Sequence, residues 1–350
     1  MLKRCFVGQV FPFERNGMKP CTRVGLDITW KCNATCKQCF YLRNPNFHNG
    51  VDIPLDQLKE RVGEAKRAGC DHAVYVGFGE PSLYPQILEL TDYCHDRFMS
   101  TSMITNGLGN PKTYEKLIDI GMNHFHISTH GVGDVLDETL GHPGASEKQE
   151  TLKQYLRLKV FPYRTNTSMQ QLNYKQLEDI AHHEIKFNVF HFVFLGFLTH
   201  YEWVDHITEV AVHPAELRPE IEKAAQLLLD NGVYITIRYH PLCHLDPQLW
   251  PYVTNARYVY FDPWEWNYDL DTVDPWGKSV ALGDSVRCTY PCNSCSAFRH
   301  CGGWDRRYAD AFNGADLKPI TEVPEMYKDV WDKDGGIFDL NPANSLSGTI

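Results

Sequence analysis

Strand-like and helix-like segments alternate over the first two thirds of this 350-residue chain. Six apolar or β-branched runs predict strands, and a helical pattern follows each of them. The predicted strands are Val24–Trp30, His72–Phe78, Ser100–Thr105, His124–Ser128, Tyr163–Ser168 and Asn188–Phe194. The predicted helices are Leu55–Ala68, Pro85–Arg97, Lys112–Ile120, Glu147–Leu158, Tyr174–His182 and Pro214–Asn231. Six strand–helix units in series predict an α/β fold with a parallel sheet wrapped by helices, and six units are too few for a closed eight-unit barrel.

This pattern changes after Gly232. Val233–Tyr239 predicts one more strand, and the chain beyond it becomes rich in aromatic residues, proline and cysteine. We therefore expect a partial-barrel domain over residues 1–232, a smaller cysteine-bearing domain over 233–320 and a C-terminal tail over 321–350.

The composition argues against two classes of partner. The net charge of −10 and the pI near 5.9 repel nucleic acid and anionic membranes, and no Lys/Arg-rich tract offsets this charge. Residues 1–13 lack the apolar core of a secretory signal, and the longest apolar stretch, Val189–Leu198, is too short to span a bilayer. We expect a cytoplasmic protein with no nucleic-acid or membrane partner, whose clustered cysteines bind metal in a reducing compartment.

Three cysteines follow the first predicted strand with the spacing C-x3-C-x2-C: Cys32, Cys36 and Cys39. Three thiolates in one short loop can hold three corners of a [4Fe–4S] cube and leave the fourth iron open for a small molecule. A zinc site is the alternative, but zinc usually takes four ligands from paired C-x2-C knuckles, and no second pair lies nearby. The spacing therefore favours an iron–sulfur cluster.

This triplet, its place near the N-terminus and the Phe40-Tyr41 pair after it resemble the radical SAM superfamily. A Gly-Phe-Gly-Glu-Pro stretch at the end of the second predicted strand matches the Gly-Glu-Pro core of the superfamily's Gly-Gly-Glu-Pro motif. The resemblance implies a partial (β/α)6 barrel that binds S-adenosyl-L-methionine (SAM). It assigns the cofactor's ammonium to Gly77, Gly79, Glu80 and Pro81, since an ammonium requires carboxylate or carbonyl acceptors.

Polar side chains at three further strand ends match the superfamily's other cofactor contacts. These are Thr105, Asn106, Ser128 and Asn166. Hydroxyl and amide groups both donate and accept hydrogen bonds, which suits ribose hydroxyls and a carboxylate. Such residues also commonly end strands and cap helices. The family often has an aromatic residue before the third cysteine, and because Gln38 stands there, adenine packing is assigned to Phe40 or Tyr41.

A second cysteine group resembles the auxiliary-cluster regions of radical SAM enzymes, called SPASM and twitch modules. Cys292, Cys295 and Cys301 have the C-x2-C-x5-C spacing of the SPASM core, but Asp305 stands where that pattern expects a cysteine. The resemblance implies one auxiliary [4Fe–4S] cluster. Its fourth ligand is either Cys288, which is close in sequence, or Cys243, which follows the Val233–Tyr239 strand and which we favour. A structural zinc knuckle is the alternative.

The resemblance implies an enzyme with SAM and two [4Fe–4S] clusters that takes electrons from an external donor such as flavodoxin or ferredoxin. A 5′-deoxyadenosyl radical would abstract hydrogen from an unactivated carbon. We expect the small-molecule substrate to be a polar metabolite, such as a sugar, aminocyclitol or nucleotide-linked compound, undergoing oxidation, epimerisation or rearrangement. The alternatives are a maturase of a ribosomally made peptide and a non-enzymatic iron–sulfur or zinc scaffold. Within Trp250–Trp276, the segment Asp262–Trp266 is the candidate substrate wall.

Overall fold

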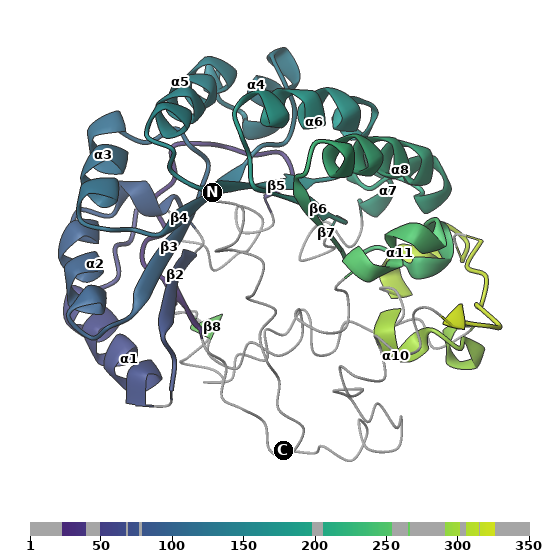
Figure 1. Ribbon diagram of the computed structural model, residues 1–350, viewed down its shortest axis with the longest axis horizontal. Helices are drawn as coiled ribbons and strands as arrows, with labels where there is room; N and C mark the ends of the chain where they lie inside the picture. Colours follow the sequence, from purple (N-terminus) through teal and green to yellow (C-terminus); the bar gives the residue numbers. More distant parts are fainter. Residues whose placement is uncertain are drawn as a thin grey trace.

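The predicted parallel sheet is present, and it is open. In the computed structural model the described residues are 23–39, 50–67, 69–76, 79–197, 206–253, 265–266, 291–301, 306–314 and 316–325. The strands are β1 (Arg23–Asp27), β2 (His72–Val76), β3 (Ser100–Thr105), β4 (His124–Ser128), β5 (Tyr163–Ser168), β6 (His191–Leu195), β7 (Tyr234–Arg238) and β8 (Glu265–Trp266). They pair in parallel in the order β7-β6-β5-β4-β3-β2-β1-β8, which leaves β7 and β8 at the two edges (Figure 1). The α/β fold with a partial barrel is therefore confirmed.

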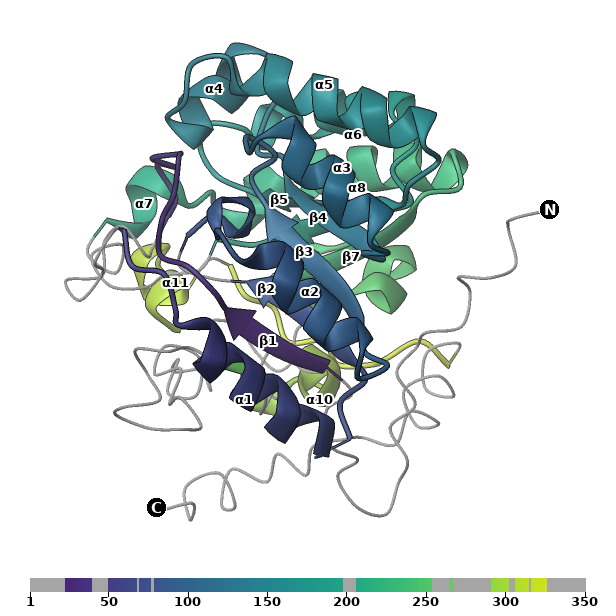
Figure 2. The same cartoon turned by 90° about the vertical axis from the view of Figure 1, so that its left-hand side faces the viewer.

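Helices cover the outer face of this sheet (Figures 1 and 2). The α-helices are α1 (Leu55–Arg67), α2 (Ile87–His95), α3 (Pro111–Asp119), α4 (Asp134–Leu140), α5 (Ala145–Leu158), α6 (Leu177–Lys186), α7 (Ile207–Val210), α8 (Pro214–Asp230), α10 (Phe298–Cys301) and α11 (Arg306–Ala311). Short 3₁₀ helices are η2 (Pro81–Leu83), η3 (Tyr174–Gln176), η5 (Leu242–His244), η6 (Pro247–Tyr252) and η7 (Cys292–Ser294). No helix in these ranges is long and apolar enough to cross a membrane.

Several elements differ from the sequence-based expectation, among them β1, which ends at Asp27 and not at Trp30. The sixth strand begins at His191, because Asn188 has a positive φ of 61° in the turn that closes α6. The short helix α4 lies between Gly133 and Gly141 and was not predicted. The strand β7 pairs with β6 as a seventh member of the sheet, so the sheet continues past residue 232. The division into domains stays a prediction.

The two faces of the sheet differ in chemistry. On β4, Phe125 and Ile127 are fully buried under the helices, whereas His124, His126 and Ser128 alternate with them and face the other way. We call this second side the inner face of the sheet. Polar residues are therefore kept on the concave side of the partial barrel, away from the apolar core.

A buried ion pair joins the helices to the sheet. Lys153 of α5 and Glu184 of α6 lie 2.6 Å apart with fully buried side chains. Glu184 also accepts hydrogen bonds from Thr165 and Tyr163 of β5, and Lys153 donates to Thr129 after β4. Although burial alone would raise it, the Lys153 ammonium lowers the pKa of Glu184 to about 2. The pair therefore stays charged and fixes α5 and α6 against β4 and β5.

Candidate cluster and cofactor site

The loop of the first three cysteines lies at the carboxyl end of β1 and is held by the end of α4. The Thr35 amide donates to the Leu140 carbonyl at 3.0 Å, and the Lys37 amide donates to the Thr139 carbonyl at 3.0 Å. The Thr35 hydroxyl also donates to the Gly141 carbonyl at 3.0 Å. Parallel α/β sheets place their chemistry at this edge.

Gly141 is required where α4 meets this loop. Its φ of 58° is left-handed, and a Cβ there would lie 2.3 Å from the Thr35 Oγ1. The next residue, His142, contacts the Asn33 carbonyl oxygen through Nδ1 at 3.0 Å. Sequence reasoning missed this contribution, because these residues stand about a hundred positions after the cysteines and match no metal-binding pattern.

The three thiols are close enough to influence one another. Burial raises the pKa of Cys32 to about 11, and the charges of Glu80 and Cys39 add to this effect. Burial also raises the pKa of Cys36, with further contributions from Cys39 and Cys32. Among the described residues no three His, Cys, Asp or Glu side chains converge on a single metal ion. A four-iron cube spaces its thiolates more widely than one ion does, so three neighbouring thiols in a fixed loop fit such a cluster.

Gly79 and Glu80 pack directly against the start of this loop. The Glu80 amide donates to the Lys31 carbonyl at 2.7 Å, and a Cβ at Gly79 would lie 2.3 Å from the same oxygen. Gly79 is therefore required for close approach to the backbone that precedes Cys32. Pro81 begins η2, and Gly77 lies outside the described residues.

The Glu80 carboxylate is surrounded by donors from the protein itself. Its side chain accepts hydrogen bonds from the Ser82 amide at 3.1 Å, the Thr105 hydroxyl at 2.6 Å and the Asn106 amide at 2.6 Å. The residue is 2% exposed, and burial raises its pKa against the opposing effect of these three bonds. Glu80 thus joins the ends of β2 and β3, a role that spacing in the sequence did not reveal.

The other strand-end residues divide into two kinds. Thr105 and Asn106 are used within the protein, and the Asn106 side chain donates to the Asn33 Oδ1 at 2.8 Å. Ser128 and Asn166 are neighbours in register on β4 and β5, and the buried Asn166 Oδ1 has no hydrogen-bond partner. An unpaired buried acceptor on the inner face fits a bound polar group such as SAM.

Gln149 of α5 supports these strand ends from behind. Its Nε2 donates to the carbonyl oxygens of Asn106 at 2.7 Å and Ser128 at 2.9 Å. A glutamine within a helical pattern gave no signal of this role. Phe40 and Tyr41, predicted to pack on adenine, lie outside the described residues.

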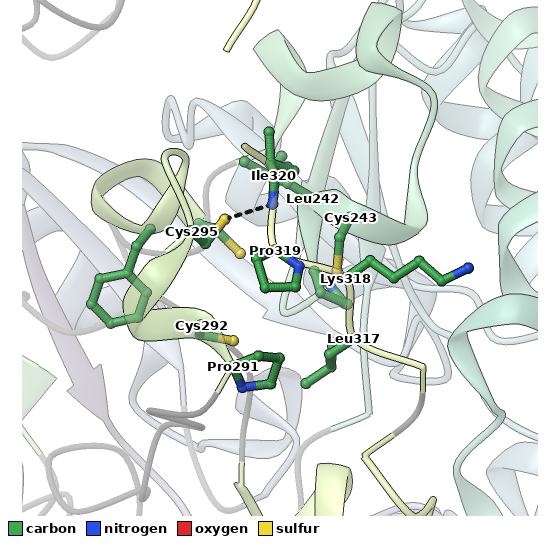
Figure 3. Close-up of a pocket in the computed structure, with 12 residues that line it drawn as sticks. Leu242, Cys243, Pro291, Cys292, Cys295, Leu317, Lys318, Pro319 and Ile320 are labelled. Atoms are coloured by element: carbon green, nitrogen blue, oxygen red, sulfur yellow. Dashed lines mark hydrogen bonds between the residues drawn. The ribbon is translucent and has the colours of Figure 1, made fainter. Parts of the chain in front are cut away.

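The second cysteine group lines a pocket between η5, η7, α10 and the segment 317–320 (Figure 3). Cys243, Cys292, Cys295 and Cys301 all belong to its wall. Burial raises the pKa of Cys243 to about 11, with Cys301 and Cys295 adding to the effect, so these thiols are near neighbours. The backbone amide of Ile320 donates to the Cys295 Sγ at 3.3 Å.

The lining of this pocket, and not its size, indicates what it could bind. Four cysteines around it fit a fully ligated iron–sulfur cluster. Cys288 and most of the predicted substrate wall, Asp262–Trp266, lie outside the described residues.

A family model matches the part of the chain that holds the first site. The model of the radical SAM superfamily matches residues 27–183, which include the three cysteines, the Gly-Glu-Pro turn and the strands β2 to β5. Residues 27–183 therefore form a radical SAM domain. The resemblance found in its motifs is therefore confirmed.

Its relatives differ in substrate. The chain is 30% identical over 138 residues to an S-adenosylmethionine-dependent nucleotide dehydratase of Selenomonas ruminantium, covering 39% of this chain and 48% of the relative. It is 30% identical over 159 residues to a PqqA peptide cyclase of Bradyrhizobium diazoefficiens, covering 44% of this chain and 41% of the relative. The chain spans less than half the length of these curated relatives.

Solved structures share the fold. Streptococcus suis SuiB bound to its precursor peptide SuiA aligns with a TM-score of 0.53 and 19% identity, covering 63% of this chain and 49% of that one. The protein anSMEcpe with bound AdoMet and Cp18Cys peptide aligns with a TM-score of 0.52 and 16% identity, covering 89% of this chain and 96% of that one. The second alignment extends beyond the family match into the region of the second cysteine group.

Proposed function

We propose that this radical SAM enzyme modifies a peptide and carries a second [4Fe–4S] cluster in the four-cysteine pocket. The main support is that four cysteines line one pocket: Cys243, Cys292, Cys295 and Cys301. Four thiols complete the coordination of a cube, so this cluster would transfer electrons and would have no open iron for substrate.

The first cluster would be bound by Cys32, Cys36 and Cys39, with SAM on the inner face beside them. When bound, the cluster and SAM together supply a 5′-deoxyadenosyl radical that abstracts hydrogen from the substrate. The residues of this chain hold the geometry: α4 fixes the cysteine loop, and Glu80 fixes β3 against it. The side chains of Ser128 and Asn166 offer polar contacts to SAM, and backbone carbonyls of the Gly-Glu-Pro turn remain candidates for its ammonium.

A peptide substrate replaces the small polar metabolite as our preferred assignment. PqqA peptide cyclases are among the relatives in sequence, and two structures that share the fold were solved with peptides bound. A small metabolite remains the second candidate, because the nucleotide dehydratase relative is equally similar in identity. An external electron donor and a cytoplasmic location are parts of this proposal.

The cluster assignment is tested by removing the first three cysteines. Replacing Cys32, Cys36 and Cys39 with alanine should halve the iron content, from about eight irons per chain to about four, and abolish formation of 5′-deoxyadenosine from SAM. The control is Cys70→Ala, because Cys70 is buried in the main core and should leave both quantities unchanged. Continued SAM cleavage by the triple variant would disprove the assignment.

The second cluster is tested by comparing Cys243→Ala with Cys288→Ala. We expect Cys243→Ala alone to make the second cluster labile and to change its EPR spectrum, because Cys243 lines the pocket. An unchanged spectrum in Cys243→Ala would contradict this ligand set. The substrate class is tested by incubating the enzyme anaerobically with deuterated peptides or metabolites and following deuterium transfer into 5′-deoxyadenosine.

A further inference from the structure

The inner face of the sheet carries a group of basic and imidazole side chains that the cluster and SAM sites do not use. Its members come from six of the strands, β1, β2, β4, β5, β6 and β7. They are Arg23, His72, His124, His126, Arg164, His191 and Arg238. We call them the inner basic group. Ser128 and Asn166 are the candidate SAM contacts. Each lies two residues nearer to the carboxyl end of its strand than the group member on that strand, His126 on β4 and Arg164 on β5.

The strand register places His126 and His191 beside Arg164, whereas Arg238 lies four residues nearer to the carboxyl end of β7 than Tyr234, which is level with them. Arg164 of β5 pairs with His126 on β4 and with His191 on β6. The imidazoles of His124 and His126 are stacked with centroids 4.6 Å apart, and those of His72 and His124 are 5.8 Å apart. Residues two apart on a strand share a face, so the group forms one continuous patch on the concave side.

Arg164 lies close enough to two other basic residues, Arg238 and Arg23, to interact with their charges. Burial lowers the pKa of Arg164 to about 9, and the charges of Arg238 and Arg23 lower it further. Burial and Arg164 lower the pKa of His124 and of His191 to about 3. Among the described residues no carboxylate forms a salt bridge with Arg164 or Arg238. The pKa shifts of Arg164, His124 and His191 come from burial and from neighbouring basic groups.

Several polar atoms of the group lack hydrogen-bond partners. His126 is 3% exposed, and both of its ring nitrogens are buried and unpaired. The Nε atoms of Arg164 and Arg238 are buried and unpaired as well. Burying polar groups and charges without partners is unfavourable by several kcal/mol in general, so such a concentration indicates a ligand that completes it. Arg164 is partly exposed as a residue, while its guanidinium is buried.

We propose that the inner basic group binds an anionic group of the substrate, a carboxylate or a phosphate, through Arg164 and Arg238 with His126 as a neutral donor. This inference rests on the proposed function, because it places the substrate on the inner face below SAM. Guanidinium groups bind both oxyanions by charge-assisted hydrogen bonds. A peptide substrate would meet the requirement with an aspartate or glutamate side chain, and a metabolite with a phosphate.

The test is anion-dependent thermal unfolding of the cluster-loaded protein under anaerobic conditions. Glutarate or inorganic phosphate is titrated at constant ionic strength, with chloride as the reference anion. We expect a saturable rise in melting temperature for one of the two anions, and the anion that binds identifies the source of the oxyanion. The matched control is Arg157→Gln, since Arg157 is exposed on α5 and should behave as wild type.

Arg164→Gln should raise the dissociation constant of the anion at least tenfold. The same variant should melt at the same or a higher temperature than wild type without anion, because it removes an unpaired buried charge. Arg238→Gln gives the second measurement if Arg164→Gln does not fold. A wild-type protein with no saturable response to either anion would overturn the proposal. So would a marked loss of stability in anion-free Arg164→Gln and Arg238→Gln, which would show that an acid of this chain already pairs with the group. Formation of 5′-deoxyadenosine from SAM alone is measured in parallel, so a failure of anion binding is distinguished from a failure of radical chemistry.

Discussion

Replacing Glu80 separates a role in the fold from a role in cofactor binding. Its carboxylate accepts three buried hydrogen bonds, from the Ser82 amide, the Thr105 hydroxyl and the Asn106 amide. Glu80→Ala leaves all three donors unpaired, and each buried unpaired donor costs about 1–3 kcal/mol. We therefore expect the free energy of unfolding to fall by roughly 3–9 kcal/mol, which is a large part of a typical domain's stability.

Glu80→Gln should have a smaller effect. The oxygen of the glutamine amide can still accept a hydrogen bond from a backbone amide. The Thr105 hydroxyl can turn and accept a hydrogen bond from the new NH₂ group. One backbone donor is then left facing a second donor, which costs about 1–3 kcal/mol. The control is Glu115→Gln on α3, where the side chain is exposed and a surface change stays within about 0.5 kcal/mol.

The assay is urea unfolding of the cluster-loaded protein, with SAM affinity measured by calorimetry on the same samples. The midpoint urea concentrations should fall in the order Glu115→Gln, Glu80→Gln, Glu80→Ala. The resemblance in the sequence assigned Glu80 to the ammonium of SAM, which predicts weaker SAM binding with both clusters intact. If Glu80→Ala unfolds at the wild-type midpoint and only its SAM affinity drops, the carboxylate serves the cofactor and the structural reasoning is refuted.

Two further predictions concern the cysteine loop and the inner face. Gly141→Ala should lower the iron retained by the first cluster. The control is Gly144→Ala, which should retain iron as wild type does, because Gly144 has a φ of 77° but open space around it. Equal iron contents in the two variants would contradict the proposed support from α4. Burial lowers the pKa of His72 to about 4, and the charges of Arg23 and Arg164 contribute. Between about pH 6.5 and about pH 4 the unfolded chain therefore binds a proton that the folded protein does not, so the free energy of unfolding should fall as the pH drops from about 6.5 to about 4. Urea midpoints that do not change over this range would contradict this prediction. So would a pH dependence in His72→Gln that is as steep as in wild type.

The strands were predictable because each is a short apolar or alternating run whose buried residues face the helices. The alternation along β4 and β5 predicted both strands with the bounds that the structure shows. Helix α4 was missed because seven residues between two glycines carry too little periodicity. The seventh strand was placed in the second domain because the sequence does not reveal which strand pairs with which.

The candidate metal-ligand cysteines could be proposed from the sequence because most of them are close in sequence. Cys32, Cys36 and Cys39 form one motif, and Cys243 was favoured because ligands of such modules follow a strand end. The internal partners of Glu80 were not predictable, since Thr105 ends another strand and Asn106 follows it. A carboxylate after a glycine has the same sequence signature whether it contacts a cofactor or the protein.

The cysteine loop is fastened by residues that the ribosome makes much later. Cys39 is synthesised about a hundred residues before Leu140 and Gly141, whose carbonyl oxygens accept the hydrogen bonds that hold Thr35. A nascent chain that ends before these residues has the three thiols but lacks the supports that set their spacing. The first cluster should therefore be inserted only after about 140 residues have left the ribosomal tunnel, and a carrier that delivers iron and sulfide earlier would meet an unstructured thiol segment.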